Sequence, residues 1–146
     1  MSSAPVRLLR RLLLDSPLSR MGAEIATLLA LLIGAPLSTG RIEFADGLIV
    51  CRGLPRWAFR RGGTCVGRVF LTRDATGPRV LRHERVHLRQ WQRYGLLFPF
   101  LYWAAGADPL RNRFEIEAGL ADGGYLTARP SASGGTRRSQ RSSRSS

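Results

Sequence analysis

The chain of 146 residues contains no lysine, only two cysteines and only two histidines. Its 23 basic residues are therefore all arginine, which we attribute mainly to a GC-rich coding sequence, and they outnumber the 10 acidic residues to give a net charge of +13. Two cysteines are too few for an iron–sulfur cluster, which usually takes four thiolates, and they do not demand a disulfide. The sequence also lacks a P-loop, a G-x-G-x-x-G run, a G-x-S-x-G run and any internal repeat, so the usual signatures of nucleotide binding and of serine hydrolases are missing.

Both histidines belong to one H-E-x-x-H motif, which runs from His83 through Glu84 to His87. Residues four apart lie on the same face of a helix, so the two imidazoles can bind one metal ion. Glu84 lies about 100° further round the helix, where its carboxylate can hold a water beside the metal and act as a general base. The motif therefore predicts a catalytic metal centre on a helix.

A catalytic zinc centre takes three protein ligands and keeps one position open. Because the sequence has no further histidine, the third ligand must be a carboxylate or a cysteine. Glu115 and Glu117 follow in a helical segment, and residues two apart point about 200° away from each other on a helix, so only one of them can face the metal. Cys51 and Cys65 remain alternatives, although both precede the motif in strand-like segments.

Strand-like segments precede the motif. Asp46-Gly47 separates two apolar runs and is typical of a type I′ turn, which predicts a hairpin over residues 41–51. Residues 65–72 form a further strand-like run. We expect an α+β fold in which a small antiparallel sheet of about three strands packs on the active-site helix and on a second helix that carries the third ligand.

Three helical segments follow the strands. The active-site helix is expected over residues 78–94, with a proline in its first turn and a glycine after its end. The apolar run 96–105 is too short to span a bilayer and predicts a buried helix broken near Pro99. A last helix is expected over residues 109–122, with Asp108 as its N-cap and two glycines after its end.

Residues 64–124 resemble the zincin metallopeptidases, and within them the gluzincins, whose third ligand is a glutamate on a later helix. Several membrane-linked gluzincin families carry a pattern of Glu, two further residues, a small residue and Asp, and the run from Glu115 to Ala118 matches its first four positions. The resemblance implies that Glu115 is the third ligand, with Glu117 as the alternative. Gly119 stands where the family has an acidic residue that steadies a histidine ligand, and Asp122, one turn later, is the candidate to replace it.

The resemblance further implies a zincin-like fold, one Zn²⁺ per chain held by His83, His87 and Glu115, and hydrolysis of a peptide or protein substrate with Glu84 as general base. In zincins the strand before the active-site helix often pairs with extended substrate. Here that strand is Val69, Phe70, Leu71 and Thr72. A zincin also needs an oxyanion donor near the metal, and the candidates are Tyr94, Tyr102 and Tyr125.

Two other classes of function stay open. The glycine at position 119 and the small size of the chain favour a catalytically degenerate zincin that binds metal and acts as a scaffold. The net positive charge instead favours a protein that binds nucleic acid or a membrane surface, although no nucleic-acid fold signature accompanies it.

The two ends of the chain differ in composition from residues 41–128, which we expect to form the zincin-like domain. Residues 1–40 combine a basic start with an apolar stretch. We expect a helix packed on the domain, with membrane association through residues 21–37 or a signal peptide as alternatives. Residues 129–146 are rich in arginine and serine and are predicted to be disordered, with weak nonspecific contacts to nucleic acid or anionic lipid. Without a clear export signal, we expect a cytoplasmic protein with reduced thiols.

Overall fold

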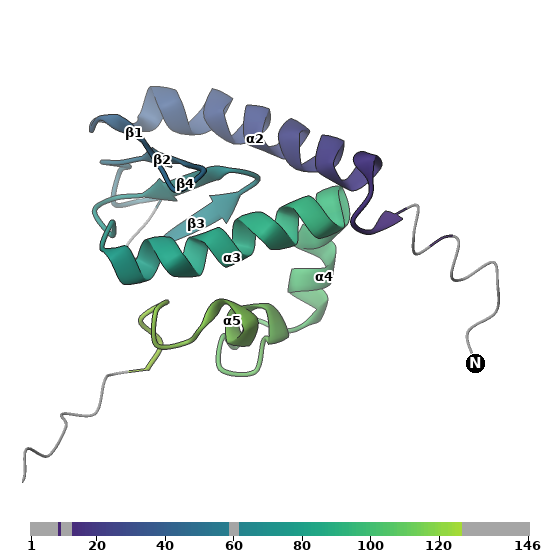
Figure 1. Ribbon diagram of the computed structural model, residues 1–146. Helices are drawn as coiled ribbons and strands as arrows, with labels where there is room; N and C mark the ends of the chain where they lie inside the picture. Colours follow the sequence, from purple (N-terminus) through teal and green to yellow (C-terminus); the bar gives the residue numbers. More distant parts are fainter. Residues whose placement is uncertain (1–8, 10–12, 59–61, 127–146) are drawn as a thin grey trace, which may run out of the picture.

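The computed structural model describes residue 9 and residues 13–58 and 62–126 (Figure 1). A four-stranded sheet is covered on one face by helix α2 (Pro17–Leu37) and on the other by helix α3 (Pro78–Tyr94). This arrangement confirms the predicted α+β class. Most of the basic start of the chain and the whole of the predicted disordered tail lie outside the described residues.

The predicted hairpin around Asp46 and Gly47 is confirmed. Strands β1 (Ile42–Ala45) and β2 (Leu48–Cys51) pair antiparallel on either side of these two residues. Asp46 and Gly47 both have a positive φ, of 53° and 84°, as the two central residues of a type I′ turn require.

The segment predicted as one strand over residues 65–72 forms a second hairpin instead. Strands β3 (Gly63–Val66) and β4 (Val69–Thr72) pair antiparallel, and the chain turns between them at Gly67. β4 also pairs in parallel with β2, which gives the strand order β1-β2-β4-β3. The expectation of about three antiparallel strands is therefore wrong, because Gly67 and Arg68 form a turn that divides the strand-like run into two strands.

The two faces of the sheet hold different parts of the core. Side chains alternate between the faces of a strand, so Val69 and Leu71 of β4 pack with Ala30 of α2, whereas Phe70 packs with Leu88 of α3. With both faces covered, β4 is buried at all four of its positions. β3 lies at the edge of the described sheet, in contact with α3.

Helix α2 packs on the rest of the protein, as predicted for the apolar stretch near the N-terminus. Ser16 caps its start and accepts a hydrogen bond of 3.1 Å from the backbone N–H of Ser19, which satisfies one of the free N–H groups of the first turn. Small side chains on its inward face let the helix lie close to its neighbours. They are Ser19, Gly22, Ala23, Ala26, Thr27, Ala30 and Gly34.

Helix α3 has the predicted bounds, and two short helices follow it. These are the 3₁₀ helix η1 (Gly95–Leu97) and helix α4 (Phe98–Ala104). Pro99 lies in the first turn of α4, where proline is well tolerated, and does not break a longer helix. The prediction that this segment is buried holds for only one side of α4, since Phe100 and Trp103 are 71% and 83% exposed.

Helix α5 (Arg113–Ala118) is shorter than the predicted helix over residues 109–122. Its N-cap is Asn112, whereas the predicted cap, Asp108, accepts a hydrogen bond only within a preceding turn. The Asn112 amide also donates to the carbonyl oxygens of Tyr102 and Gly106, at 3.1 and 2.8 Å. These contacts fix the start of α5 against α4, and local sequence patterns do not reveal them.

Candidate metal centre

Helix α3 places both histidines and Glu84 inside the protein. His83 and His87 are 3% and 7% exposed, and their Nε2 atoms lie 3.1 Å apart. Glu84 is buried too and lines the same pocket. The four-residue spacing therefore brings the two imidazoles to one point, with a carboxylate beside them.

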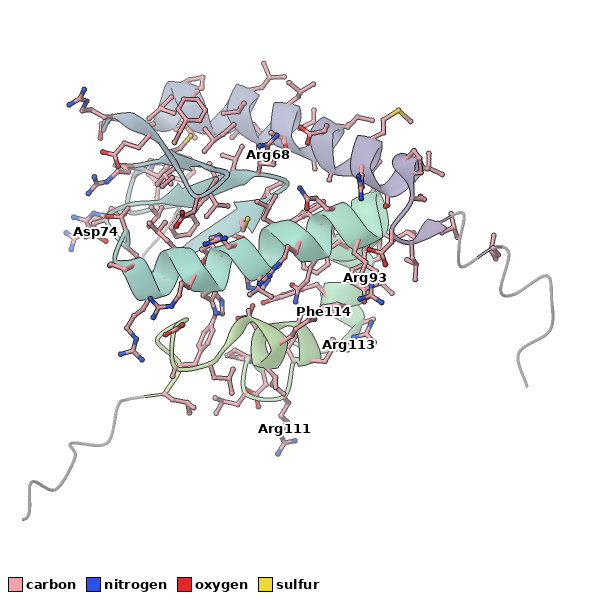
Figure 2. The ribbon with its side chains drawn as sticks, viewed as in Figure 1. Arg68, Asp74, Arg93, Arg111, Arg113 and Phe114 are labelled. Carbon is pink, nitrogen blue, oxygen red and sulfur yellow. The ribbon has the colours of Figure 1, made fainter. Side chains whose placement is uncertain are left out.

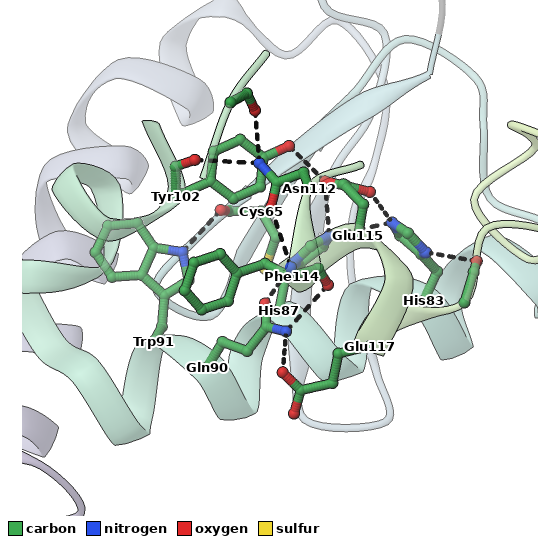
Figure 3. A network of polar contacts seen from close by, with 12 residues as sticks. Cys65, His83, His87, Gln90, Trp91, Tyr102, Asn112, Phe114, Glu115 and Glu117 are labelled. Atoms are coloured by element: carbon green, nitrogen blue, oxygen red, sulfur yellow. Dashed lines mark hydrogen bonds and ion pairs between the residues drawn. The ribbon is translucent and has the colours of Figure 1, made fainter. Parts of the chain in front are cut away.

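Helix α5 adds Glu115 to the two histidines (Figure 3). Its Oε2 atom lies 3.1 Å from His83 Nε2 and its Oε1 atom lies 3.4 Å from His87 Nε2. Tyr102 donates a hydrogen bond of 2.5 Å to Oε1. One ligand atom from each of His83, His87 and Glu115 lies within 4.8 Å of the others, and no second cluster of this kind occurs in the described part of the chain. The three residues form a group that could hold a metal ion.

The alternative ligands lie elsewhere. Glu117 faces away from the cluster, and the Nε2 atom of Gln90 donates to its carboxylate at 3.0 Å (Figure 3). Cys51 is buried among apolar side chains between the sheet and α2. Cys65 lines the pocket, but burial raises the pKa of its thiol well above the usual value, which disfavours the thiolate that a metal needs. Glu115 is therefore the residue that completes the cluster.

A backbone carbonyl, and not Asp122, lies behind His83. The Nδ1 atom of His83 is 3.1 Å from the carbonyl oxygen of Gly119. Asp122 instead accepts hydrogen bonds from Arg82 (3.2 Å) and Arg79 (3.1 Å), and these guanidinium groups hold the pKa of its carboxyl below the usual value. Asp122 therefore does not take the predicted place beside the histidine, because the chain leaves the helix at Gly119 and presents that residue's carbonyl to the ring.

Gln90 lies behind the second histidine, and the sequence analysis did not single it out. Its Oε1 atom is 2.8 Å from His87 Nδ1. The one sequence clue is that Gln90 follows His87 by three residues, which puts it on the same face of α3. Each histidine thus has an acceptor on the ring nitrogen that points away from the cluster.

Burial and neighbouring charges act in opposite directions on the carboxylates. Burial raises the pKa of Glu84 to about 7, against the lowering effects of His87 and His83. Burial alone would also raise the pKa of Glu115, but hydrogen bonds with His83, His87 and Tyr102 hold that pKa well below its usual range. The cluster therefore keeps one carboxylate ionised, while the other can exchange a proton near neutral pH.

The charge on Glu115 also acts on His83. Burial by itself lowers the pKa of this histidine, but the hydrogen bond with Glu115 and the charge of Glu84 outweigh it, so the net pKa is raised. The electrostatic potential at the site is thus negative and attracts a cation.

The cluster opens into a pocket of about 370 Å³. Of the three predicted oxyanion donors, Tyr102 and Tyr125 line this pocket, whereas Tyr94 packs in the aromatic core. Tyr102 already donates to Glu115. The ring of Tyr125 lies 6.0 Å from that of His83, and burial raises the pKa of its hydroxyl to about 12, so it keeps the proton that an oxyanion donor needs.

The strand beside the pocket is β3 and not the predicted strand Val69–Thr72. That predicted strand, β4, is hydrogen-bonded to β2 on one side and to β3 on the other, so no backbone groups are left to pair with a peptide. All four residues of β3 line the pocket, and its outer side has no strand partner in the described sheet. An extended peptide could therefore pair with β3.

The donor atoms of the cluster fit a divalent metal ion. The carbonyl of Gly119 can only accept a hydrogen bond, so Nδ1 of His83 carries a proton, and Nε2, which faces the cluster, is the nitrogen that would give its lone pair to a metal. Among the described residues, Glu84 Oε2 is buried without a hydrogen-bond partner, and Glu115 Oε2 faces His83 Nε2 at 3.1 Å. Imidazole nitrogens and carboxylate oxygens gathered in a buried place are costly unless a cation or a proton joins them. Two imidazoles and one carboxylate are a donor set of catalytic zinc sites.

Gly123 leaves room for the ring of His83, which gives a test of the geometry. A Cβ at this position would lie 2.6 Å from His83 Cε1 and 2.8 Å from Nδ1. We expect Gly123→Ala to push the ring off its carbonyl partner and to weaken the binding of a divalent metal such as zinc by about 10–100-fold, the usual cost of losing such a partner. Titration of zinc against a chelator measures the affinity. Gly77→Ala is the matched control, since its Cβ would meet nothing within 4 Å, and equal affinities of the two variants would contradict the geometry.

Comparison with known proteins finds no match to this chain, neither with a family model nor with a curated protein nor with a solved structure. The His83–His87–Glu115 cluster and the pocket around it are features of the described structure that bear on function.

Proposed function

We propose that the protein is a zinc-dependent peptidase whose metal ion is held by His83, His87 and Glu115. The observation that carries this proposal is the carboxylate of Glu84, which is buried beside the cluster and has one oxygen without a hydrogen-bond partner in the described residues. A metal that only stabilises a fold needs no such group. A carboxylate beside a bound metal can take a proton from water as a general base.

The residues around the cluster can divide the work of peptide hydrolysis among them. Zinc, when bound, acts as a Lewis acid and lowers the pKa of a water toward ~7. Glu84 takes a proton from the attacking water while the oxygen of that water adds to the peptide carbonyl carbon. Tyr125 donates a hydrogen bond to the carbonyl oxygen as that oxygen gains negative charge. Glu84 then gives the proton to the nitrogen, and the C–N bond breaks. One water is consumed, and a carboxylate and a protonated amine are formed, since the second proton of the water also ends on the amine nitrogen.

The free edge of β3 supports a peptide as the substrate. Strand addition holds an extended chain through backbone hydrogen bonds, which give affinity without regard to sequence. Phe98, Pro99 and Tyr102 of α4 also line the pocket, and these side chains can pack against the substrate. A peptide bound in this way would pass along the cluster.

Cleavage of a peptide library by the zinc-loaded protein tests the proposal. We expect new peptide ends that mass spectrometry detects, loss of cleavage when a chelator removes the zinc, and recovery when zinc is added back. Zinc bound at one per chain with no cleavage of any peptide would contradict the peptidase and would favour a metal-binding scaffold instead.

We also propose that the protein lies on an anionic membrane surface through α2. Among the described residues, α2 is the one helix long and apolar enough to cross a membrane, but its inward face belongs to the core and could not face lipid without leaving the fold. Its outward face is a stripe of large apolar side chains, each at least 43% exposed, which we call the α2 stripe. Its members are Leu18, Met21, Ile25, Leu28, Leu29, Leu32 and Ile33.

Positive charge accompanies the α2 stripe. Arg20 lies on α2 itself, whereas the charge of Arg68, next to the helix, is offset by Glu24 in an ion pair of 3.7 Å (Figure 2). The whole chain carries a net charge of +13. Arginine near an anionic membrane contributes about 1 kcal/mol per residue, and a helix with one apolar exposed face lies in the plane of the interface. Apolar burial and charge therefore favour the same partner, an anionic lipid surface.

Sedimentation with lipid vesicles tests the membrane proposal. We expect binding to phosphatidylglycerol vesicles that exceeds binding to phosphatidylcholine vesicles, and a decrease of at least ~10-fold for Leu28→Ser/Leu32→Ser, since each buried leucine contributes about 1.5–3 kcal/mol. Ile116→Ser is the matched control because Ile116 is 52% exposed on α5, on the side of the protein opposite α2 (Figure 1). Equal vesicle binding of both variants would overturn the proposal.

A further inference from the structure

Gln90 is a buried amide whose polar atoms are all used within the protein. It is 2% exposed on the face of α3 that meets α5. Its Oε1 atom lies 2.8 Å from His87 Nδ1, and its Nε2 atom donates to the Phe114 carbonyl oxygen at 3.1 Å and to Glu117 Oε2 at 3.0 Å (Figure 3). A buried amide with three partners is fixed in place more firmly than a side chain that only fills space.

The partners of Gln90 determine which way its amide faces. The Phe114 carbonyl and the Glu117 carboxylate can only accept hydrogen bonds, so the NH₂ group must face them and the oxygen must face His87. An amide oxygen is itself only an acceptor. Nδ1 of His87 therefore carries a proton, and Nε2, which faces His83 and Glu115, is the nitrogen left for a metal.

The same amide joins the two helices that supply the cluster. His87 lies on α3, whereas Phe114 and Glu117 lie on α5, on either side of Glu115 in the sequence. A rotation or slide of α5 against α3 would break the hydrogen bonds of Gln90 as well as move Glu115. The hydrogen bonds of Gln90 thus restrict the distance between His87 and Glu115.

We propose that Gln90 is the positioning residue of the metal centre. It holds His87 in the Nδ1–H form with the Nε2 lone pair toward the metal, it ties His87 to the segment of α5 that carries Glu115, and Glu117 fixes the direction of its amide. This inference rests on the proposed metal centre. It also gives Glu117 a role, since the two glutamates of α5 act from opposite sides of the helix, one in the cluster and one on the amide behind it.

Two variants of the full-length chain separate positioning from mere packing. Gln90→Leu keeps the size of the side chain but removes the acceptor, and we expect zinc affinity to fall by about 10–100-fold. In Gln90→Glu/Glu117→Gln a carboxylate faces His87 Nδ1 and the amide at position 117 can donate to it, while the hydrogen bond to the Phe114 carbonyl is lost. We expect this variant to bind zinc more tightly than Gln90→Leu and less tightly than the wild type. Gln92→Leu, two residues along the same helix, is the control for loss of an amide on α3.

The tautomer of His87 gives a second readout that needs no metal. Nitrogen-15 NMR of the metal-free protein distinguishes Nδ1–H from Nε2–H imidazole. We expect Nδ1 of His87 to carry a proton in the wild type and in the exchanged variant, and to carry it only part of the time in Gln90→Leu.

The two readouts distinguish failure of this inference from failure of the metal centre. A folded Gln90→Leu that keeps wild-type zinc affinity, or an unchanged His87 tautomer in that variant, would overturn the positioning role while leaving the centre intact. If the wild type bound no zinc, the proposed centre would fail, and the tautomer measurement would still decide whether Gln90 orients His87.

Discussion

Glu84→Gln should lower the rate of peptide hydrolysis by about 10²–10⁴-fold, the usual contribution of a general acid–base group. The variant keeps the shape of the side chain but cannot take the proton of the attacking water. Because Glu84 is not one of the three residues that converge on the metal position, zinc should remain bound at one per chain. The comparison is made with zinc-loaded proteins on one fluorogenic peptide chosen from the library.

A matched substitution separates the role of Glu84 from a general effect of lost charge. Glu24→Gln removes an equal charge from α2, where Glu24 is exposed and contacts only Arg68 among the ion pairs of the described residues. This control should hydrolyse the peptide at the wild-type rate. A Glu84→Gln variant as active as the Glu24→Gln control would show that the buried carboxylate is not the base and would remove the main support for the peptidase.

Glu115→Ala should weaken zinc binding by more than the ~10–100-fold that follows from losing a residue that only orients a ligand. The substitution removes the one carboxylate of the cluster, and it leaves the two histidine Nε2 atoms, 3.1 Å apart, without a negative partner. Glu117→Ala should lower the zinc affinity by at most ~10–100-fold, because Glu117 acts only through Gln90. Chelator competition on both variants measures the difference.

The two glutamates thus serve as controls for each other. They lie on the same short helix, and both substitutions remove one negative charge from it. A thermal melt of each metal-free variant shows whether the fold survives. If Glu117→Ala lost zinc as completely as Glu115→Ala, the assignment of the third ligand would be wrong.

The parts of the site that the sequence predicted depend on short-range order. The bounds of α3 follow from Pro78 in its first turn and from Gly95 after its end, and the four-residue spacing then brings His83 and His87 together. The hairpin at Asp46 likewise follows from the local turn preference of Asp-Gly. Each of these features needs only residues that are near one another in the chain.

The parts that the sequence did not predict depend on contacts between distant segments. Asn112 caps α5 because its side-chain amide donates hydrogen bonds to carbonyl oxygens of α4 and of the loop after α4. Asp108 followed by proline is nevertheless the stronger local pattern for a helix start. The partner of His83 is a carbonyl group, which every residue has, so no side-chain pattern marks Gly119. The edge position of β3 follows from the parallel pairing of β2 with β4, which is decided across a long connection.

The exposed apolar side chains of α2 and α4 are a further feature that the sequence alone did not predict. An apolar stretch predicts burial, and the inward sides of both helices are buried as expected. The outward sides carry the α2 stripe and the aromatic residues Phe100 and Trp103. The fold is too small to cover both sides of its helices, so hydrophobicity alone does not tell core from interface.

The central claim is that His83, His87 and Glu115 bind a metal ion, and elemental analysis of the purified full-length chain beside a His83→Ala/His87→Ala variant tests it most directly. We predict about one zinc per chain in the wild type, as for a three-ligand catalytic site, and close to none in the variant. A wild type that holds no metal even after zinc is added back, or a variant that holds as much zinc as the wild type, would contradict the account.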